Sequence, residues 1–245
     1  MSKKNRANDR AARAAAALAE QQREERRRRN LMIGGVVGVI LLIVIGGYFV
    51  ARSLDTTTDV TADPPSSSSD LGLTIGPDDA PNKVVIYEDF LCPYCGDFEA
   101  ASRDDLAQLA ADGKVQVEYR PFDFLVSLGD YSARSAGAFS IVLDKSGPEI
   151  AKKFHDLLYE NQPDEKGPFP KNDELADLAV KAGADDAAVR DAIVNNKGQD
   201  WVDKATQAAA SAGVAGTPTI LLNGEVFQDG RTQEDIAKNL ISQLQ

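Results

Sequence analysis

The sequence predicts an α/β domain built on a mixed β-sheet with helices on its faces, an inserted helical subdomain, and one transmembrane helix ahead of it. Three observations support this fold class. A strand-like run at 83–87, a helical stretch at 93–111 and a second strand-like run at 115–119 follow in β-α-β order. Strand signals then vanish over 130–212, and a strand, a hairpin and a helix return at 219–244. Alternation that ends in a hairpin is typical of a mixed sheet covered by helices.

The β-α-β segment has clear local signals. Lys83–Tyr87 (KVVIY) is an apolar, β-branched run, which predicts a buried strand. Pro93 suits the first turn of a helix, because the N–H that proline lacks would have no partner there. We expect this helix to continue to about Ala111, and the alternating run Val115–Tyr119 (VQVEY) to form the second strand. The side chains available for the buried face of the helix are Phe98, Leu106 and Leu109.

The segment at about 130–212 is too long for a single crossover, so we expect an inserted helical subdomain there. After it, Thr219–Leu222 predicts a strand, and Asn223-Gly224 is a strong hairpin signal. Glu225–Phe227 completes the hairpin, and 232–244 predicts the last helix. Breaks near glycines divide the insertion into helices expected at 131–144, 148–161, 172–182, 186–196 and 199–212.

Residues 31–50 contain no charged side chain and are long enough to cross a membrane as one helix. Arg26–Arg29 precede this run, so the positive-inside rule keeps the N-terminus in the cytoplasm and places the rest of the chain outside. A cleaved signal peptide is the alternative, but its apolar region is normally shorter. As a small-x-small cleavage site, Ala51-Arg52-Ser53 is poor, because an arginine lies inside it. We therefore expect a retained anchor in the cell membrane.

Charge divides the chain, whose formal net charge is −11. Residues 1–30 hold ten basic and four acidic side chains and form the predicted basic cytoplasmic segment, whereas 31–245 hold 17 basic and 34 acidic ones. An acidic body argues against nucleic acid as a partner, because that binding relies on Lys and Arg. Residues 51–70 are rich in Ser, Thr, Pro and Asp and predict a disordered linker. Gly34 and Gly38 give a GxxxG spacing, a weak signal for dimerisation through the membrane helix.

The chemically informative motif is Cys92-Pro93-Tyr94-Cys95. Two cysteines at this spacing can close and reopen a small disulfide ring, and a helix N-terminus lowers the pKa of the first thiol. A purely structural disulfide is the alternative, although so short a ring constrains little of the unfolded chain. A metal site at the pair would need two more ligands, yet the only histidine is His155. We expect a redox pair, with no metal and no cofactor.

A second motif, Gly216-Thr217-Pro218, lies just before the returning strand. Proline costs a ladder hydrogen bond within a sheet, so it is usual at an edge or at the first position of a strand. An X–Pro bond at such a place can be cis. Taken alone, the motif predicts a turn.

Together, CPYC after a strand, TPT before a hairpin and the helical insertion between them resemble the thioredoxin superfamily. The long insertion is most similar to its DsbA-like branch, and YEDFLCPYC at 87–95 resembles that branch's D-F-x-C-P-x-C pattern. The resemblance covers about 72–245. It implies that Cys92 is the exposed nucleophile, that Cys95 is the resolving thiol, and that Thr217-Pro218 is a cis bond facing them. Gly216 and the backbone at Thr217 would then pair with an extended substrate.

The chain departs from that pattern at two positions. Tyr94 stands where DsbA-like proteins often carry His, and Ile86 stands where they often carry a buried acid. Asp89 fits the pattern best as a replacement acid for proton transfer, with Glu88 as the alternative. Pro93 and Tyr94 are also expected to tune the pair.

Aromatic side chains and the histidine give further expectations. Phe90 and Tyr94 lie close to the cysteines in sequence and predict an apolar patch for peptide docking. Phe122 and Phe124 are expected in the core, and Trp201 in the core of the insertion. His155, in KKFHDLLYE, lies among charges on a helix and is expected at the surface.

These expectations describe an extracytoplasmic, membrane-tethered thiol:disulfide oxidoreductase that forms disulfides in exported polypeptides. The resemblance implies a quinone-linked membrane partner, of DsbB or VKOR type, that reoxidises the cysteines. The alternatives are an envelope reductase or isomerase, or a tethered binding module with an inert disulfide.

Overall fold

The structure is a computed structural model that describes residue 60 and residues 70–245. The predicted basic segment, the predicted span at 31–50 and nearly all of the predicted linker lie outside these residues. Within the described residues, no helix is both long enough and apolar enough to cross a membrane.

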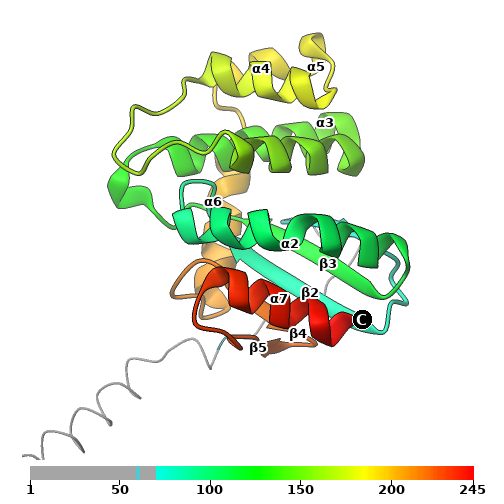
Figure 1. Cartoon of the computed structure of the whole chain (residues 1–245). Coiled ribbons are helices and arrows are strands. Elements are labelled where there is room, and N and C mark those ends of the chain that lie inside the picture. The colour runs from blue at the N-terminus through cyan, green and yellow to red at the C-terminus, as the bar shows by residue number, and fades with distance from the viewer. Residues whose placement is uncertain (1–59, 61–69) are drawn as a thin grey trace, which may run out of the picture. The chain divides into compact units, whose positions relative to one another are not determined.

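The centre of the described domain is a five-stranded mixed sheet with the order β1-β3-β2-β4-β5 (Figure 1). β2 and β3 are parallel, as expected for strands joined by a helix, and the other pairs are antiparallel. Central β2 therefore pairs with strands from both halves of the sequence. The strands are β1 (Leu73–Ile75), β2 (Asn82–Glu88), β3 (Val115–Pro121), β4 (Thr219–Leu222) and β5 (Glu225–Val226).

Helices cover both faces of the sheet. α2 and α7 lie side by side on one face and α6 crosses the other, while α4 and α5 pack on the far side of α3 (Figure 1). The helices are α2 (Pro93–Ala111), α3 (Tyr131–Glu160), α4 (Asn172–Ala182), α5 (Asp186–Val194), α6 (Gln199–Ser211) and α7 (Gln233–Leu244), with a short 3-10 turn, η2, at Val126–Leu128.

The alternation of side chains along β2 explains the two layers. Val84 and Ile86 face the large core formed with α2, α3 and α7, whereas Val85 and Tyr87 face a smaller core under α6. Successive side chains of a strand point to opposite sides, so an unbroken apolar run is needed when both faces are covered. The run KVVIY meets this requirement, and it carries the chain to the edge of the sheet where the cysteines follow.

The predicted mixed sheet and helical insertion are confirmed, with two differences in detail. β1 was not predicted, because its three residues are too few to show the alternating pattern of a strand. This segment is a strand because it pairs with β3. The predicted helices at 131–144 and 148–161 form one element, α3, with a kink. Gly147 has the non-helical angles φ 80° and ψ 174° there, so the glycine separates two helical segments that run on from each other.

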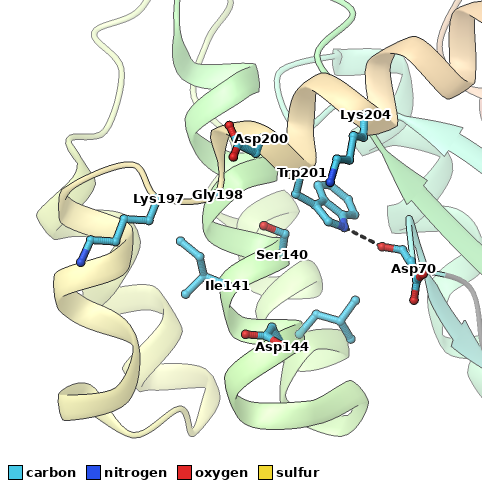
Figure 2. A pocket seen from close by; sticks show the side chains of 10 residues that line it. Asp70, Ser140, Ile141, Asp144, Lys197, Gly198, Asp200, Trp201 and Lys204 are labelled. Atoms are coloured by element: carbon cyan, nitrogen blue, oxygen red, sulfur yellow. Dashed lines mark hydrogen bonds between the residues drawn. The ribbon is translucent and has the colours of Figure 1, made fainter.

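Trp201 lies partly buried between the insertion and the sheet. Its indole N–H donates to the carbonyl oxygen of Asp70 over 2.7 Å, and the side chain packs against both cores. It lines a pocket of about 470 Å³ beside α3, together with Ser140, Asp144 and Lys204 (Figure 2). The residue expected in the core of the insertion thus also joins that subdomain to Asp70, shortly before β1.

Candidate active site

The two cysteines lie where the chain leaves β2 and begins α2. Cys92 is the N-cap residue and Pro93 occupies the first helical position. The backbone N–H groups of Cys95 and Gly96 donate to the carbonyl oxygen of Cys92 over 3.1 and 3.2 Å, which closes the first turn. The first sulfur is therefore placed at a helix N-terminus, where negative charge is favoured.

Both cysteines are free thiols and both are buried, which corrects the expectation of an exposed Cys92. Hydrogen bonding with Cys95 lowers the pKa of Cys92 to about 6; burial opposes this shift, and Thr217 and backbone groups of the first turn add to it. Burial raises the pKa of Cys95 well above its usual value, and the neighbouring Cys92 adds to this. The pair thus consists of one thiol prepared to ionise and one that holds its proton.

The cis-proline segment reaches the first cysteine from the other half of the chain. Thr217–Pro218 is a cis peptide bond, and the thiol of Cys92 donates to the carbonyl oxygen of Thr217 over 3.3 Å. The hydroxyl of Thr219 donates to the carbonyl oxygen of Gly216 over 2.7 Å, which fixes the turn. This contact covers the sulfur of Cys92 and explains why it is less exposed than expected.

Asp89 acts as a structural anchor in this loop. One carboxylate oxygen accepts from the N–H of Leu91 over 2.8 Å, and the other accepts from the N–H groups of Phe124 and Leu125, each over 2.9 Å. Burial raises the pKa of Asp89, and these backbone donors oppose the shift. The carboxylate therefore ties the loop before Cys92 to the loop after β3, and its hydrogen bonds position the motif.

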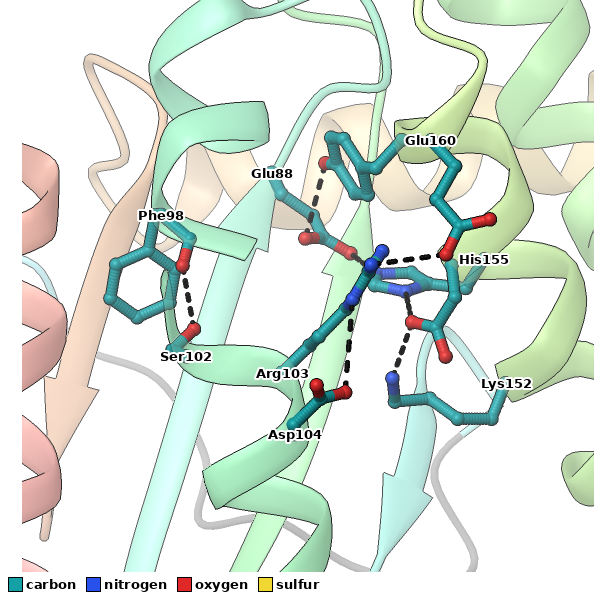
Figure 3. A network of polar contacts seen from close by, with 10 residues as sticks. Glu88, Phe98, Ser102, Arg103, Asp104, Lys152, His155 and Glu160 are labelled. Carbon is teal, nitrogen blue, oxygen red and sulfur yellow. Dashed lines mark hydrogen bonds and ion pairs between the residues drawn. The ribbon is translucent and has the colours of Figure 1, made fainter. Parts of the chain in front are cut away.

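Glu88 forms a buried cluster with the inserted subdomain, shown in Figure 3. It is fully buried at the end of β2; one of its oxygens lies 2.7 Å from Nε2 of His155, and the other accepts from the hydroxyl of Tyr159 over 3.2 Å. His155 Nδ1 lies 3.2 Å from Asp156, which also pairs with Lys152. Burial works to lower the pKa of His155, but the adjacent charge of Glu88 and the hydrogen bonds to Asp156 and Glu88 outweigh it, so the pKa rises to about 9.

The expectation of a surface His155 is wrong. The charged residues on either side of His155 suggested that it is exposed. Its burial depends instead on its position on the helix, because residues three and four apart share one face of a helix. His155 belongs to the buried stripe of α3, which comprises Ala151, Phe154, His155, Leu158 and Tyr159.

Glu99, on α2, completes the buried cluster. It is 1% exposed, and neither of its carboxylate oxygens has a hydrogen-bond partner. Burial raises its pKa to about 7, with the charge of His155 opposing the shift. Sequence reasoning missed this residue, although an acid at the fourth position after Cys95 lies one turn along the same helix face.

Gln162 is a second residue that sequence reasoning missed. Its amide donates to the carbonyl oxygens of Phe90 and Cys92 over 2.9 and 3.0 Å, from the end of α3. A Cβ at Gly96 would lie 2.5 Å from the amide oxygen of Gln162. Glycine directly after the second cysteine therefore allows the insertion to hold the active-site loop.

The aromatic residues divide differently from the expectation. Phe90 is 1% exposed and packs against Phe139 and Tyr159, so it belongs to the core and cannot form a docking patch. Phe122 is buried as expected, whereas Phe124 is 37% exposed because the loop bound by Asp89 carries it outward. Tyr94, at 63%, is the exposed aromatic of the motif.

Comparison with known proteins identifies the family of the domain. Residues 68–241 match a thioredoxin family, so the match includes the cysteine pair, the insertion and the cis-proline turn. The chain belongs to this family. Among solved structures, DsbA from Mycobacterium tuberculosis in its oxidised form is 30% identical, with a TM-score of 0.60, over 71% of this chain and 90% of that chain.

Further neighbours carry similar descriptions. The disulfide bond oxidoreductase DsbG from M. tuberculosis is 30% identical, with a TM-score of 0.58, over 76% of this chain and 82% of its own. A probable disulfide bond formation protein D from Bacillus cereus is 28% identical over 62% of this chain and 70% of its own. The names of these relatives describe proteins that form disulfide bonds or act as disulfide oxidoreductases.

One group of relatives is much longer. The serine/threonine-protein kinase PknE of M. tuberculosis is 27% identical over 61% of this chain, which spans only 28% of the length of that kinase. The similarity is therefore confined to one part of PknE.

Proposed function

We propose that this protein is a membrane-tethered dithiol oxidase that introduces disulfides into exported polypeptides through Cys92 and Cys95. The observation that carries the proposal is the asymmetry of the pair. Cys92, at a helix N-terminus and facing cis Pro218, has its pKa lowered to about 6, while the pKa of buried Cys95 is raised. A stabilised thiolate favours the reduced form of a pair, which makes its disulfide an oxidant.

The reaction follows from the two positions. A substrate thiolate attacks Cys92 in the Cys92–Cys95 disulfide; the sulfur–sulfur bond breaks, and Cys95 leaves with the electron pair and takes up a proton. A second substrate thiolate then attacks the substrate sulfur of the mixed disulfide, and Cys92 leaves as a thiolate. The substrate loses two electrons and the pair gains them. Because Cys92 is stable as a thiolate, it is a good leaving group in the second step.

A pocket beside the cis-proline supports a polypeptide substrate. It has a volume of about 280 Å³ and is lined by Pro218, Ile220, Phe227 and Ile236, among others. Exposed Tyr94 adds an apolar side chain at the motif itself. An extended segment paired with the backbone at Gly216 and Thr217 would place its cysteine near Cys92, with a neighbouring side chain in the pocket.

The remaining parts of the proposal concern location and turnover. The uncharged run at 31–50 after Arg26–Arg29 supports a single-pass anchor, with the cysteines outside the cytoplasm. Because each turnover leaves two thiols, a second protein has to remove two electrons. We propose a quinone-linked membrane oxidase of DsbB or VKOR type for this step, which agrees with the DsbA-like neighbours.

Trapping of mixed disulfides tests the roles of the two sulfurs. In Cys95→Ser, the Cys92 thiolate can still attack a client disulfide, with one client sulfur leaving as a thiolate, which is the reverse of the second step. The mixed disulfide should accumulate and disappear on reduction, because Cys95 is not present to attack Cys92 and release the client. Cys92→Ser is the matched control and should form none. Equal trapping by both variants would contradict the assignment.

Protease accessibility tests the location. A protease added to intact cells should cut within 53–70 and release a soluble fragment that carries both cysteines. Complete protection of the chain would contradict the proposed topology, and a mature chain that begins near Leu54 would contradict a retained anchor.

A further inference from the structure

The buried cluster behind the cysteines has an unusual electrostatic composition. Two carboxylates, Glu88 and Glu99, come from β2 and α2, and the imidazole of His155 comes from α3. One oxygen or nitrogen of each side chain lies within 4.8 Å of the corresponding atoms of the other two. All three residues are buried, so water does not screen them.

Glu99 has no hydrogen-bond partner, although the charge of His155 lies nearby. Both of its oxygens are buried without a hydrogen bond. A buried carboxylate without a hydrogen bond or counter-charge in contact is costly, and such groups in folded proteins call for an explanation. The neighbouring cations are bound to other groups. Lys152 pairs with Asp156 and Arg103 with Glu160 (Figure 3), while the ring nitrogens of His155 face Glu88 and Asp156.

We propose that Glu88, Glu99 and His155 bind a divalent transition-metal ion of the zinc type. Two ligands of a tetrahedral zinc ion lie roughly 3.3 Å apart, given zinc–ligand bonds of about 2.0–2.2 Å. Glu88 and His155 are already 2.7 Å apart, so an ion between them needs a small separation of the two side chains and a swing of Glu99 toward them. Three protein ligands leave one coordination position of a tetrahedral ion open.

The surroundings of His155 favour this use. Its Nδ1 faces Asp156, so Nε2 is the nitrogen directed into the cluster. A carboxylate on the outer ring nitrogen is the usual partner of a metal-binding histidine. Imidazole with two carboxylates suits zinc, cobalt or nickel, whereas calcium requires six to eight oxygen ligands, which this cluster does not supply. The rings of Phe90, Tyr119 and Phe139 surround the imidazole and exclude water.

The test uses the full chain without an affinity tag and with both cysteines replaced by serine, because a dithiol also binds zinc. After treatment with EDTA, this parent should bind one equivalent of Zn²⁺ in competition with a chromogenic chelator. Its melting temperature should rise with Zn²⁺ and stay unchanged with Ca²⁺. Co²⁺ should give visible d–d absorption without a sulfur charge-transfer band. Because the cysteines are absent, the result does not depend on the proposed oxidase activity.

Two glutamate variants in this parent separate a site from unspecific binding. Glu99→Gln keeps the size of the side chain and should weaken Zn²⁺ binding at least tenfold and abolish the thermal shift. Glu160→Gln, on α3 and 46% exposed at its side chain, is the matched control and should bind like the parent. Absence of stoichiometric Zn²⁺ binding in the parent, or equal binding by parent and Glu99→Gln, would overturn the proposal. A melting curve without metal shows that Glu99→Gln is folded; if it is not, Glu99→Met, which has a similar size and no carboxylate, takes its place under the same criteria.

Discussion

The two sides of the cysteine motif differ in how they are built. On the side of Cys92, the helix N-terminus, the cis Thr217–Pro218 bond and an adjacent pocket surround a thiol with a lowered pKa. On the side of Cys95, the chain buries Glu88, Glu99 and His155 in a cluster formed by three elements. The first side carries the reacting sulfur, and the second holds charges in a low-dielectric core. One short motif thus joins a reactive thiol to a buried polar network.

The largest effect is expected when the buried side loses a partner. His155→Gln leaves the Glu88 carboxylate without its nearest counter-charge, and removal of one member of a buried pair typically costs about 3–5 kcal/mol. Denaturant unfolding with EDTA present should show a loss of this order. Adding Glu88→Gln should recover part of it, because the uncompensated charge is then gone. A loss below about 1 kcal/mol would show that the two residues are not coupled.

A smaller effect is expected where the insertion holds the motif. Gln162→Ala removes two donors to carbonyl oxygens and should cost about 1–3 kcal/mol, at about 1 kcal/mol for each hydrogen bond. It should also slow mixed-disulfide formation by Cys92, since the loop is less well held. Asn161→Ala is the matched control, because the Asn161 amide binds only the Leu157 carbonyl of its own helix. If both variants lose the same stability and form mixed disulfides at the same rate, Gln162 does not hold the active-site loop.

The reactive side should also show a characteristic pH dependence. The pKa of Cys92 is lowered in the folded state from 9.0 to about 6. A lowered pKa contributes stability that is fully present above the unfolded value and is lost as the pH falls through the folded one. Reduced protein should therefore gain stability over Cys92→Ser between pH 6 and 9, and alkylation of Cys92 should rise with a midpoint near pH 6. A midpoint near 9 would contradict the lowered pKa.

These two sides also differ in how far sequence reasoning can reach. The reactive side consists of local signals: CPYC after an apolar run, and Thr-Pro before an NG hairpin. The buried side depends on residues far apart in the sequence, of which His155 was expected at the surface and Glu99 and Gln162 were not anticipated. The charged residues beside His155 made the buried face of α3, from Ala151 to Tyr159, difficult to recognise in the sequence. The contacts of Glu99 and Gln162 depend on how three elements pack, which a local sequence pattern does not contain. The short β1 was missed for the same reason.

The smallest expected effect concerns exposed Tyr94. Tyr94→His introduces a side chain that can donate to the thiolate, which should lower the pKa of Cys92 and raise the reduction potential together. Because both quantities report the same stabilisation, about 30 mV should accompany each pKa change of about one unit. Absorbance of the thiolate at about 240 nm and equilibration with glutathione measure the two. A change in the reduction potential without a change in the pKa of Cys92 would contradict this relation.

The reduction potential of the full chain tests the proposed oxidase most directly. The helix N-terminus and the hydrogen bonds to Cys92 stabilise the thiolate. Tyr94 stands where a histidine would supply one further donor. We therefore expect a potential of about −150 to −230 mV, between the values of about −120 mV for DsbA and about −270 mV for thioredoxin. Equilibration in glutathione buffers, read by alkylation of the free thiols, gives this value. A potential within that interval supports an oxidase, and one below about −260 mV would contradict it and indicate a reductase.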